Sequence, residues 1–464
     1  MDPIRHMGEL PVGRLLARYS LPAIAGFLAN ALYQLADRVI IGRGVGTDAM
    51  AAVTAAFPLS IVGMAVALLL GTGTGNRISV LLGQKDRDGA ERVLGQSVRL
   101  GLIAGCVLAL VVFAFTRPLL VACGCEPRLL PLAIPFTRIL AVGQIFAIVL
   151  IAMGNILRVQ GRPMLGLGFM LGSNALNVFL ALVAVFVLHL GVTGTALATA
   201  ISQATGCLLV VAFVQSPRSV LRIRGHFLRA DWATARAIVT LGAPFGLMQV
   251  LATAVFLAAN HGAASQAGSR GLATLGVLNT VAMLLIYPSL GVMQAMMPLV
   301  GYNKGAGRID RVRAILVRVL VTCTGMGVFF SVMIAVFPGP VAGLFSKSDP
   351  ELVEMVRLGL PWFVVPITLF SLAGTMAHFF LSVHQPLKAA VLLLGRQVLA
   401  IPLFLTLPRL LGFYGMYLAA PLADLPFAVV GATYVIRELA RLRAAIAVQT
   451  RPAADAPIAA DTGG

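Results

Sequence analysis

The chain has 464 residues, of which 59% are hydrophobic and only 11% are charged, and its formal net charge is +18. Soluble globular domains contain about 25% charged residues, so this composition excludes an ordinary soluble protein and indicates one that crosses a membrane many times. Because the Lys and Arg residues lie in short connections between apolar segments, they indicate membrane orientation and contact with lipid headgroups, and no nucleic-acid partner is expected.

Twelve apolar segments follow one another along the chain, separated by Gly, Pro and charged residues. About 20 apolar residues are enough for a helix to cross a bilayer, so each segment is predicted to be one transmembrane helix of an all-α membrane protein. The predicted spans are roughly 16–41, 52–80, 94–115, 131–156, 163–188, 192–214, 236–259, 272–299, 313–337, 356–380, 387–407 and 413–436.

The first span carries polar residues in an otherwise apolar sequence. They stand at i, i+4, i+7 and i+8, which places them on one face of a helix: Asn30, Gln34, Asp37 and Arg38. A carboxylate at that depth is costly next to lipid, so this face is expected to look into protein or a water-filled cavity. The pattern is typical of a transport site.

The basic residues are distributed unevenly among the connections. The two ends of the chain and the connections after even-numbered spans hold most of the Lys and Arg, for example Arg218, Arg222 and Arg224. Because basic residues stay on the cytoplasmic side, both termini are predicted to be cytoplasmic, in a multi-pass protein of the inner (plasma) membrane.

The second half of the chain repeats the first. Four blocks match at offsets of 218 to 223 residues, among them Gly161-Arg162-Pro163 with His384-Gln385-Pro386 at 223, and Gly191 with Gly412 at 221. Two pseudo-symmetric six-helix bundles in the same orientation follow from this repeat. We therefore expect an N-terminal lobe over 1–215, a basic cytoplasmic linker over 216–235, a C-terminal lobe over 236–440 and a disordered tail over 441–464.

Three stretches resemble the multidrug and toxic compound extrusion (MATE) transporters, and the similarity extends over essentially all twelve spans. They are LADRVIIGRGVGTDAMAAV around Asp37, PLVGYNKGAG at 298–307 and LGVTGTALATAISQ at 190–203. The resemblance implies export, by alternating access, of organic and often cationic drugs or toxic metabolites in exchange for H⁺ or Na⁺. A monomer is expected, with small organic cations and the lipid bilayer as its partners.

The resemblance also implies which residues couple transport to an ion. Asp37 stands at the position of the family's first-helix carboxylate, and Thr199 resembles the Thr that completes the same cluster on the sixth helix. The family often has Asn-x-x-x-Asp on the fifth helix, where this chain has Asn177 and Ala181. Asp37, Asn177 and Thr199 are thus the expected ion-coupling residues and a possible Na⁺ site. The missing carboxylate favours H⁺, because Na⁺ prefers charged oxygen ligands.

Other polar residues inside the spans are candidates for a substrate cavity. Their alternative role is to form hydrogen bonds that hold neighbouring helices together. For Asp424 the alternative is a structural ion pair with Arg396. The expected cavity residues are Asn30, Gln34, Asn174, Thr195, Ser202, Gln203, Gln294 and Asp424.

No motif indicates an enzyme or a cofactor. Gly71-Thr-Gly-Thr-Gly75 lacks the Lys-Ser/Thr of a phosphate-binding loop, and no nucleophile–base pair is evident. The alternative function is a flippase for a lipid-linked oligosaccharide or a related lipid. Such a protein would need a cavity lined by Arg to bind a diphosphate, and the candidates are Arg38, Arg77, Arg138, Arg158 and Arg396.

Overall fold

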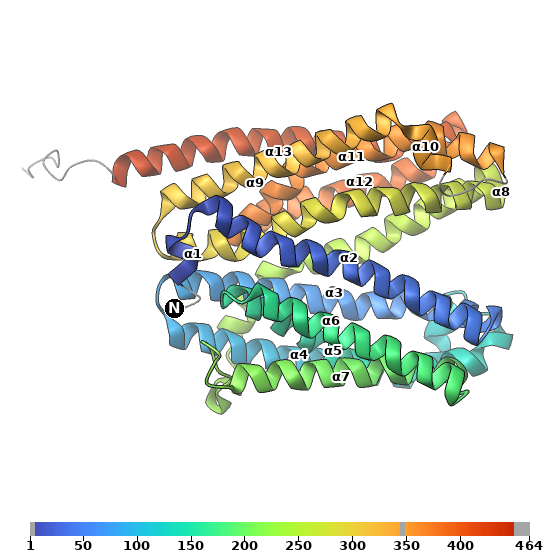
Figure 1. Cartoon of the computed structure of the whole chain (residues 1–464), viewed down its shortest axis with the longest axis horizontal. Helices are drawn as coiled ribbons and strands as arrows, with labels where there is room; N and C mark the ends of the chain where they lie inside the picture. The colour runs from blue at the N-terminus through green and yellow to red at the C-terminus, as the bar shows by residue number, and fades with distance from the viewer. Residues whose placement is uncertain (1–4, 344–348, 450–464) are drawn as a thin grey trace, which may run out of the picture.

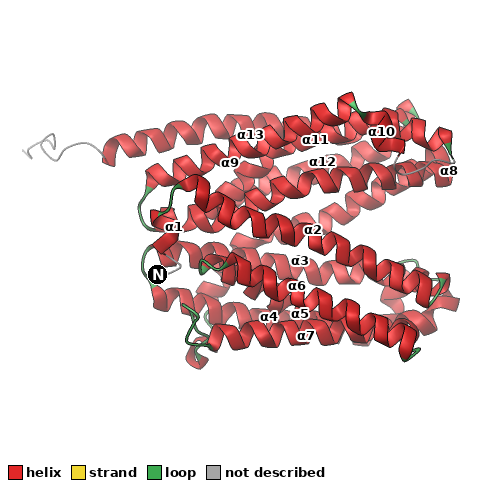
Figure 2. Ribbon diagram, in the orientation of Figure 1, coloured by secondary structure: helices red, strands yellow, loops and turns green. Residues whose placement is uncertain are grey.

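The computed structural model describes residues 5–343 and 349–449, and these form helices joined by short turns, with no strand among them (Figure 2). The long helices are α2 (Val12–Gly44), α3 (Thr47–Gly83), α4 (Arg87–Ala122), α5 (Leu130–Val159), α6 (Pro163–Leu182), α7 (Gly191–Gln215), α8 (Trp232–Gly305), α9 (Ile309–Val336), α11 (Pro350–Ser382), α12 (Pro386–Leu411) and α13 (Tyr414–Gln449). The short elements are α1 (Arg5–Glu9), α10 (Pro338–Gly343), η1 (Pro127–Leu129), η2 (Val183–Val187) and η3 (Gly225–Leu228).

Helix α8 contains two of the predicted spans. At about 1.5 Å per residue a straight helix of its 74 residues would be far longer than a bilayer is thick. Its backbone is broken at Ala267 and at Gly268, where φ is 55°, so the chain reverses there. Eleven helices of the described part are long and apolar enough to span a membrane, and α8 is one of them. The prediction of a twelve-helix, all-α membrane protein is confirmed.

The helices form two groups with α2 running diagonally between them (Figure 1). Helices α3 to α7 pack on one another and make the N-lobe. Helices α9, α11, α12 and α13 pack on α8 and α10 packs on α11, and together they make the C-lobe. The first turns of α2 pack on the C-lobe, where Leu15 and Tyr19 join a buried cluster with Met293 and Ile315. Beyond its middle, α2 packs on α6 and α7.

The lobes meet along α3 and α8 near the end of the bundle where the chain begins. Glycines allow the backbones to touch there: a Cβ atom on Gly242 would overlap the carbonyl oxygen of Leu69, and one on Gly73 would overlap that of Ile238. Gly305 lies equally close to Val80. We call this contact the seam, and the end of the bundle at which it lies the basic end, because the Arg-rich turns 158–162 and 304–313 lie there.

The connection between the lobes is tied to the N-lobe. Arg224 Nε lies 2.6 Å from the buried carboxylate of Glu91 near the start of α4. Gln96 Nε2 donates to Phe227 O at 2.7 Å. Asp231 accepts from Thr234 Oγ1 at 2.6 Å and caps α8 by accepting from Thr234 N at 3.1 Å, and these two bonds hold the pKa of its carboxyl group below the usual value.

The end of α13 differs from the prediction. A disordered tail was expected from residue 441, but α13 continues as a regular helix to Gln449. The sequence RLRAAIAVQ at this point consists mostly of good helix formers, which outweighs its lack of an apolar span. The predicted tail residues 450–464 lie outside the described residues.

Candidate functional site

Asp37 lies in the second half of α2, on the side that faces α6 and α7. Ile40, one turn further on, is buried against Ala181 and Ala198, which fixes this face of α2 against the N-lobe. Asp37 is partly buried and makes no ion pair within the described part of the chain. The only charge found to act on the carboxylate among the described residues is that of its sequence neighbour Arg38, with which it makes no ion pair.

Tyr33 is a member of this site that the sequence analysis missed. Its side chain interacts with the Thr199 side chain and lies within electrostatic range of the Asp37 carboxylate. The position could have been found, because Tyr33 precedes Asp37 by four residues and therefore shares its helix face. Tyr33 links the acid on α2 to the polar residues of α7.

Asn177 of α6 connects the polar residues of α6 and α7. Its Nδ2 donates to Thr199 Oγ1 at 2.9 Å and to Ser202 Oγ at 3.3 Å. Both hydroxyls already donate to main-chain carbonyls, Thr199 to Thr195 O and Ser202 to Thr199 O, so they can only accept from Asn177. This fixes the amide orientation and leaves Asn177 Oδ1 buried with no hydrogen-bond partner among the described residues. An unpartnered buried acceptor is suited to bind a proton donor or a cation.

The second carboxylate of the family pattern is absent from this cluster. Ala181 is buried in apolar contact with Ile40 and Ala198, so no polar atom replaces the missing acid. Within residues 5–343 and 349–449, no three His, Cys, Asp or Glu side chains lie close enough together to hold a metal ion. A cation here would have one carboxylate, from Asp37, and otherwise neutral oxygens.

The remaining predicted cavity residues of the N-lobe are distributed over several environments. Thr195 is buried and donates to Val192 O at 2.8 Å, as a helix-internal bond. Gln203 packs on Gly143 of α5, and its Oε1 is buried with no hydrogen-bond partner in the part of the chain that the structure describes. Asn174 Nδ2 is likewise buried and unpartnered, whereas Asn30 is partly buried and Gln34 is exposed.

Gln294 lies at the seam. Its Oε1 accepts from Arg158 Nη1 at 2.6 Å, and this bond joins α5 of the N-lobe to α8. In this conformation Gln294 therefore contributes to closing the basic end.

Asp424 forms an ion pair with Arg396, which was the alternative considered for it. Arg396 Nε and Nη2 both donate to the carboxylate, the latter at 3.2 Å. Asp424 is only 2% exposed, and the guanidinium also lies 5.8 Å from the centre of the Phe370 ring. The pair joins α12 to α13 inside the C-lobe.

Comparison with known proteins gives one matching family, described as MatE, over residues 22–183 and 244–406. The chain is similar to the multidrug export protein MepA of Staphylococcus aureus (strain MSSA476), with 25% identity over 426 residues that cover 91% of this chain and 93% of that protein. MepA of Staphylococcus haemolyticus (strain JCSC1435) is 24% identical with the same coverage.

Solved structures of MATE transporters share the fold. A crystal structure of MATE in the bent conformation superposes with a TM-score of 0.89, at 22% identity, and covers 96% of this chain and 99% of that one. An outward-facing multidrug resistance MATE family transporter of the MOP superfamily gives 0.87 with the same identity and coverage.

Proposed function

Because the chain belongs to the MatE family of multidrug export transporters, we propose that it exports small organic, often cationic, molecules in exchange for a coupling cation. The observation that carries this proposal is the position of Asp37. It is an acid within a membrane span, one helical turn from Tyr33, whose side chain interacts with Thr199 of the Asn177–Thr199–Ser202 cluster. An acid in such a place is more typical of transport than of structure.

Protonation of Asp37 would couple the ion to the substrate. The ionised carboxylate attracts a cationic substrate, and the protonated carboxyl group does not. Once protonated, the group gains a donor, and on the neighbouring helix α6 Asn177 Oδ1 is a buried acceptor that has no partner among the described residues. Proton binding and substrate binding would then exclude each other at one side chain, as antiport requires.

We favour H⁺ over Na⁺ as the coupling ion. A Na⁺ site would use oxygens of Asp37, Asn177 and Thr199, with a single negative charge among them. The position that could add a second carboxylate is Ala181, in an apolar contact. Hard cations bind more weakly when charged oxygen ligands are lost, whereas a proton needs only one carboxylate.

Access to the site would alternate between the two sides of the membrane. The lobes touch at the seam, which closes the basic end, and rocking of one lobe against the other would open it. The concentration of Lys and Arg supports a cytoplasmic basic end in the inner membrane. We propose a monomer as the working unit, since each chain contains both lobes.

Three of the five arginines considered for a flippase have partners elsewhere. Arg396 pairs with Asp424, and Arg158 bonds to Gln294. Arg138 donates to Thr116 Oγ1 at 3.2 Å and lies over the ring of Phe113. These contacts occupy guanidinium groups that a flippase would need to bind a diphosphate. They therefore favour drug export over lipid flipping.

The test uses everted membrane vesicles that contain the protein and a pH-sensitive dye. With a proton gradient established and no Na⁺ present, addition of ethidium should dequench the dye as protons leave in exchange. Asp37→Asn should reduce this signal to that of vesicles without the protein. Asp48→Asn is the matched control, because it removes an exposed carboxylate at the start of α3 and should leave the exchange unchanged.

Two results would contradict parts of this proposal. Full activity in correctly inserted Asp37→Asn would exclude Asp37 as the coupling residue. A strict requirement for Na⁺ would retain drug antiport but overturn proton coupling.

A further inference from the structure

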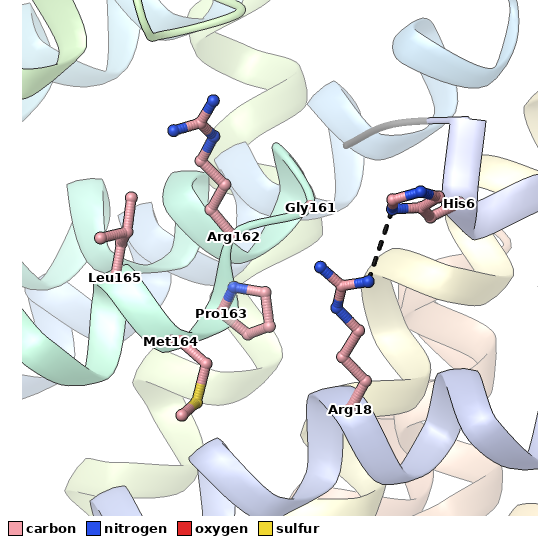
Figure 3. Close-up of a pocket in the computed structure, with 7 residues that line it drawn as sticks. All are labelled: His6, Arg18, Gly161, Arg162, Pro163, Met164 and Leu165. Carbon is pink, nitrogen blue, oxygen red and sulfur yellow. Dashed lines mark hydrogen bonds between the residues drawn. The ribbon is translucent and has the colours of Figure 1, made fainter. Parts of the chain in front are cut away.

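A cavity at the basic end lies away from the Asp37 site. It has a volume of about 320 Å³ and is lined by His6 of α1, Arg18 of α2 and residues 161–165 of the turn into α6 (Figure 3). Arg18 Nη1 lies 3.4 Å from His6 Nδ1, so two basic side chains meet there. None of the seven described lining residues is acidic. The site is therefore suited to a negatively charged group.

The His6–Arg18 contact leaves hydrogen-bond donors available. If His6 Nδ1 accepts from Arg18, the ring proton is on Nε2, which remains a donor. Arg18 is exposed and keeps further N–H groups, and it makes no ion pair within the described residues. Arg162 points away from both, and its guanidinium lies 5.7 Å from the centre of the Phe213 ring.

Two exposed apolar stripes end at this cavity. On α2 the first stripe begins at Arg18, and its members follow at intervals of three, four or seven residues, so they share one helix face. These exposed members are Leu21, Ala25, Leu32, Leu35 and Val39. On α6, Met164 begins a similar stripe, which continues with Gly168, Leu171, Ala175, Phe179 and Leu182. The two helices pack together through Gly26 and Met170. Exposed apolar stripes on spanning helices are suited to contact acyl chains.

We propose that the cavity binds the phosphate of an anionic phospholipid, with Arg18 and His6 on the headgroup and the acyl chains along the two stripes. A cluster of basic residues at the end of a lipid-facing surface is what such a headgroup requires. The guanidinium can bind phosphate oxygens through charge-assisted hydrogen bonds. The apolar stripes favour a lipid over free phosphate, which would make no use of them.

The bound lipid would connect the two lobes. The segment that carries His6 is fixed to the C-lobe, because Arg311 Nη2 donates to Leu10 O at 2.6 Å and Asn303 Nδ2 donates to Met7 O at 3.1 Å. Arg308 donates to Gly8 O, and Met7 is fully buried. The opposite wall of the cavity, 161–165, belongs to the N-lobe. A lipid in contact with both walls would stabilise the closed basic end.

The test measures lipid retention and needs no transport, so its failure is distinct from failure of the proposed function. The full-length protein is purified in detergent and titrated with phosphatidylglycerol or phosphatidylcholine of identical acyl chains, and bound lipid is counted by native mass spectrometry. Wild type should retain phosphatidylglycerol selectively. Arg18→Ala and His6→Ala should each weaken this retention, Arg18→Ala by about tenfold, the usual effect of losing a charged hydrogen bond.

Arg14→Ala is the matched control, since Arg14 is exposed one turn earlier on the same face of α2 but does not line the cavity. It should retain phosphatidylglycerol as wild type does. Equal retention of both lipids, or equal loss in Arg14→Ala and Arg18→Ala, would overturn the site. Displacement of the lipid by millimolar inorganic phosphate would overturn its assignment to a lipid. If Arg18→Ala does not fold, Arg18→Gln and His6→Ala decide the same question.

Discussion

Asp37 and Asp424 are both aspartates inside predicted membrane spans, but the structure gives them different surroundings. Asp424 forms an ion pair with Arg396, whereas Asp37 makes no ion pair within the described residues and lies one helical turn from Tyr33. The sequence predicted that both acids are inside spans. It could not distinguish their roles, because the partner of Asp424 lies 28 residues away on another helix and depends on how the two helices are rotated. For the same reason, the position of Gln294 at the seam could not be predicted.

Asp424→Asn should destabilise the protein strongly. The change leaves the Arg396 guanidinium poorly compensated inside the C-lobe, which typically costs about 3–5 kcal/mol. Thermal unfolding in detergent should show a clear decrease in Tm, and Arg396→Met/Asp424→Leu should recover much of it because no charge is left unpaired. A double variant as unstable as Asp424→Asn would contradict a purely structural pair.

His384, in the turn between α11 and α12, should make stability depend on pH. Burial, together with the nearby Lys304 and Arg77 cations, lowers the pKa of His384 from 6.5 to about 4. The unfolded chain therefore binds this proton at a higher pH than the folded chain does. The contribution of neutral His384 is fully present above pH 6.5 and is lost as the pH falls toward 4.

The corresponding measurement is Tm in detergent between about pH 7.5 and pH 5, for wild type and His384→Asn. Asn tolerates the positive φ of 60° at this position, so the variant removes the titrating imidazole and changes the conformation of the turn little. The decrease in Tm on acidification should be smaller in the variant, by the equivalent of about 1–3 kcal/mol. An identical decrease in both proteins would assign the pH dependence to other groups.

At the scale of the helices, composition predicted where the chain crosses the membrane but not how its helices end or join. The break in α8 at Gly268 and the extension of α13 to Gln449 lie outside the apolar spans that hydropathy detects. The seam could not be predicted from the sequence either, because the presence of a glycine in a span does not show whether another backbone contacts it. Gly242 and Gly276 are both in α8, but a Cβ atom on Gly242 would meet Leu69, whereas one on Gly276 would have no neighbour within 4 Å.

Gly242→Ala should weaken the seam. Its methyl group would overlap the Leu69 carbonyl, and overpacking of this kind costs about 1–3 kcal/mol. The basic end should then open more often, which can be measured as faster maleimide labelling of Ser79→Cys, a buried seam position, in a background without other cysteines. Gly276→Ala is the control and should label at the original rate; faster labelling in both variants would show a general loosening of α8.

For the whole molecule, the repeat in the sequence is matched by a repeat in the backbone. The turns at equivalent places in the two halves have positive φ values, which are 80° at Gly161 and 60° at His384, and 58° at Gly191 and 60° at Gly412. His384 takes this conformation although it is not a glycine. The weak matches in the sequence thus marked turns of the same shape, which is why they predicted two pseudo-symmetric bundles although few residues are identical.

The way in which α1 is attached has a consequence for how this protein tolerates mutation. Arg308, Arg311 and Asn303 donate to main-chain carbonyls of residues 7–10, and every amino acid supplies such a carbonyl. Most substitutions in this segment would therefore leave the attachment intact, apart from those at the buried Met7 and at Gly8, where a side chain would meet Arg308. The segment can vary widely in sequence and still carry out its role, provided that its length and helical shape are kept.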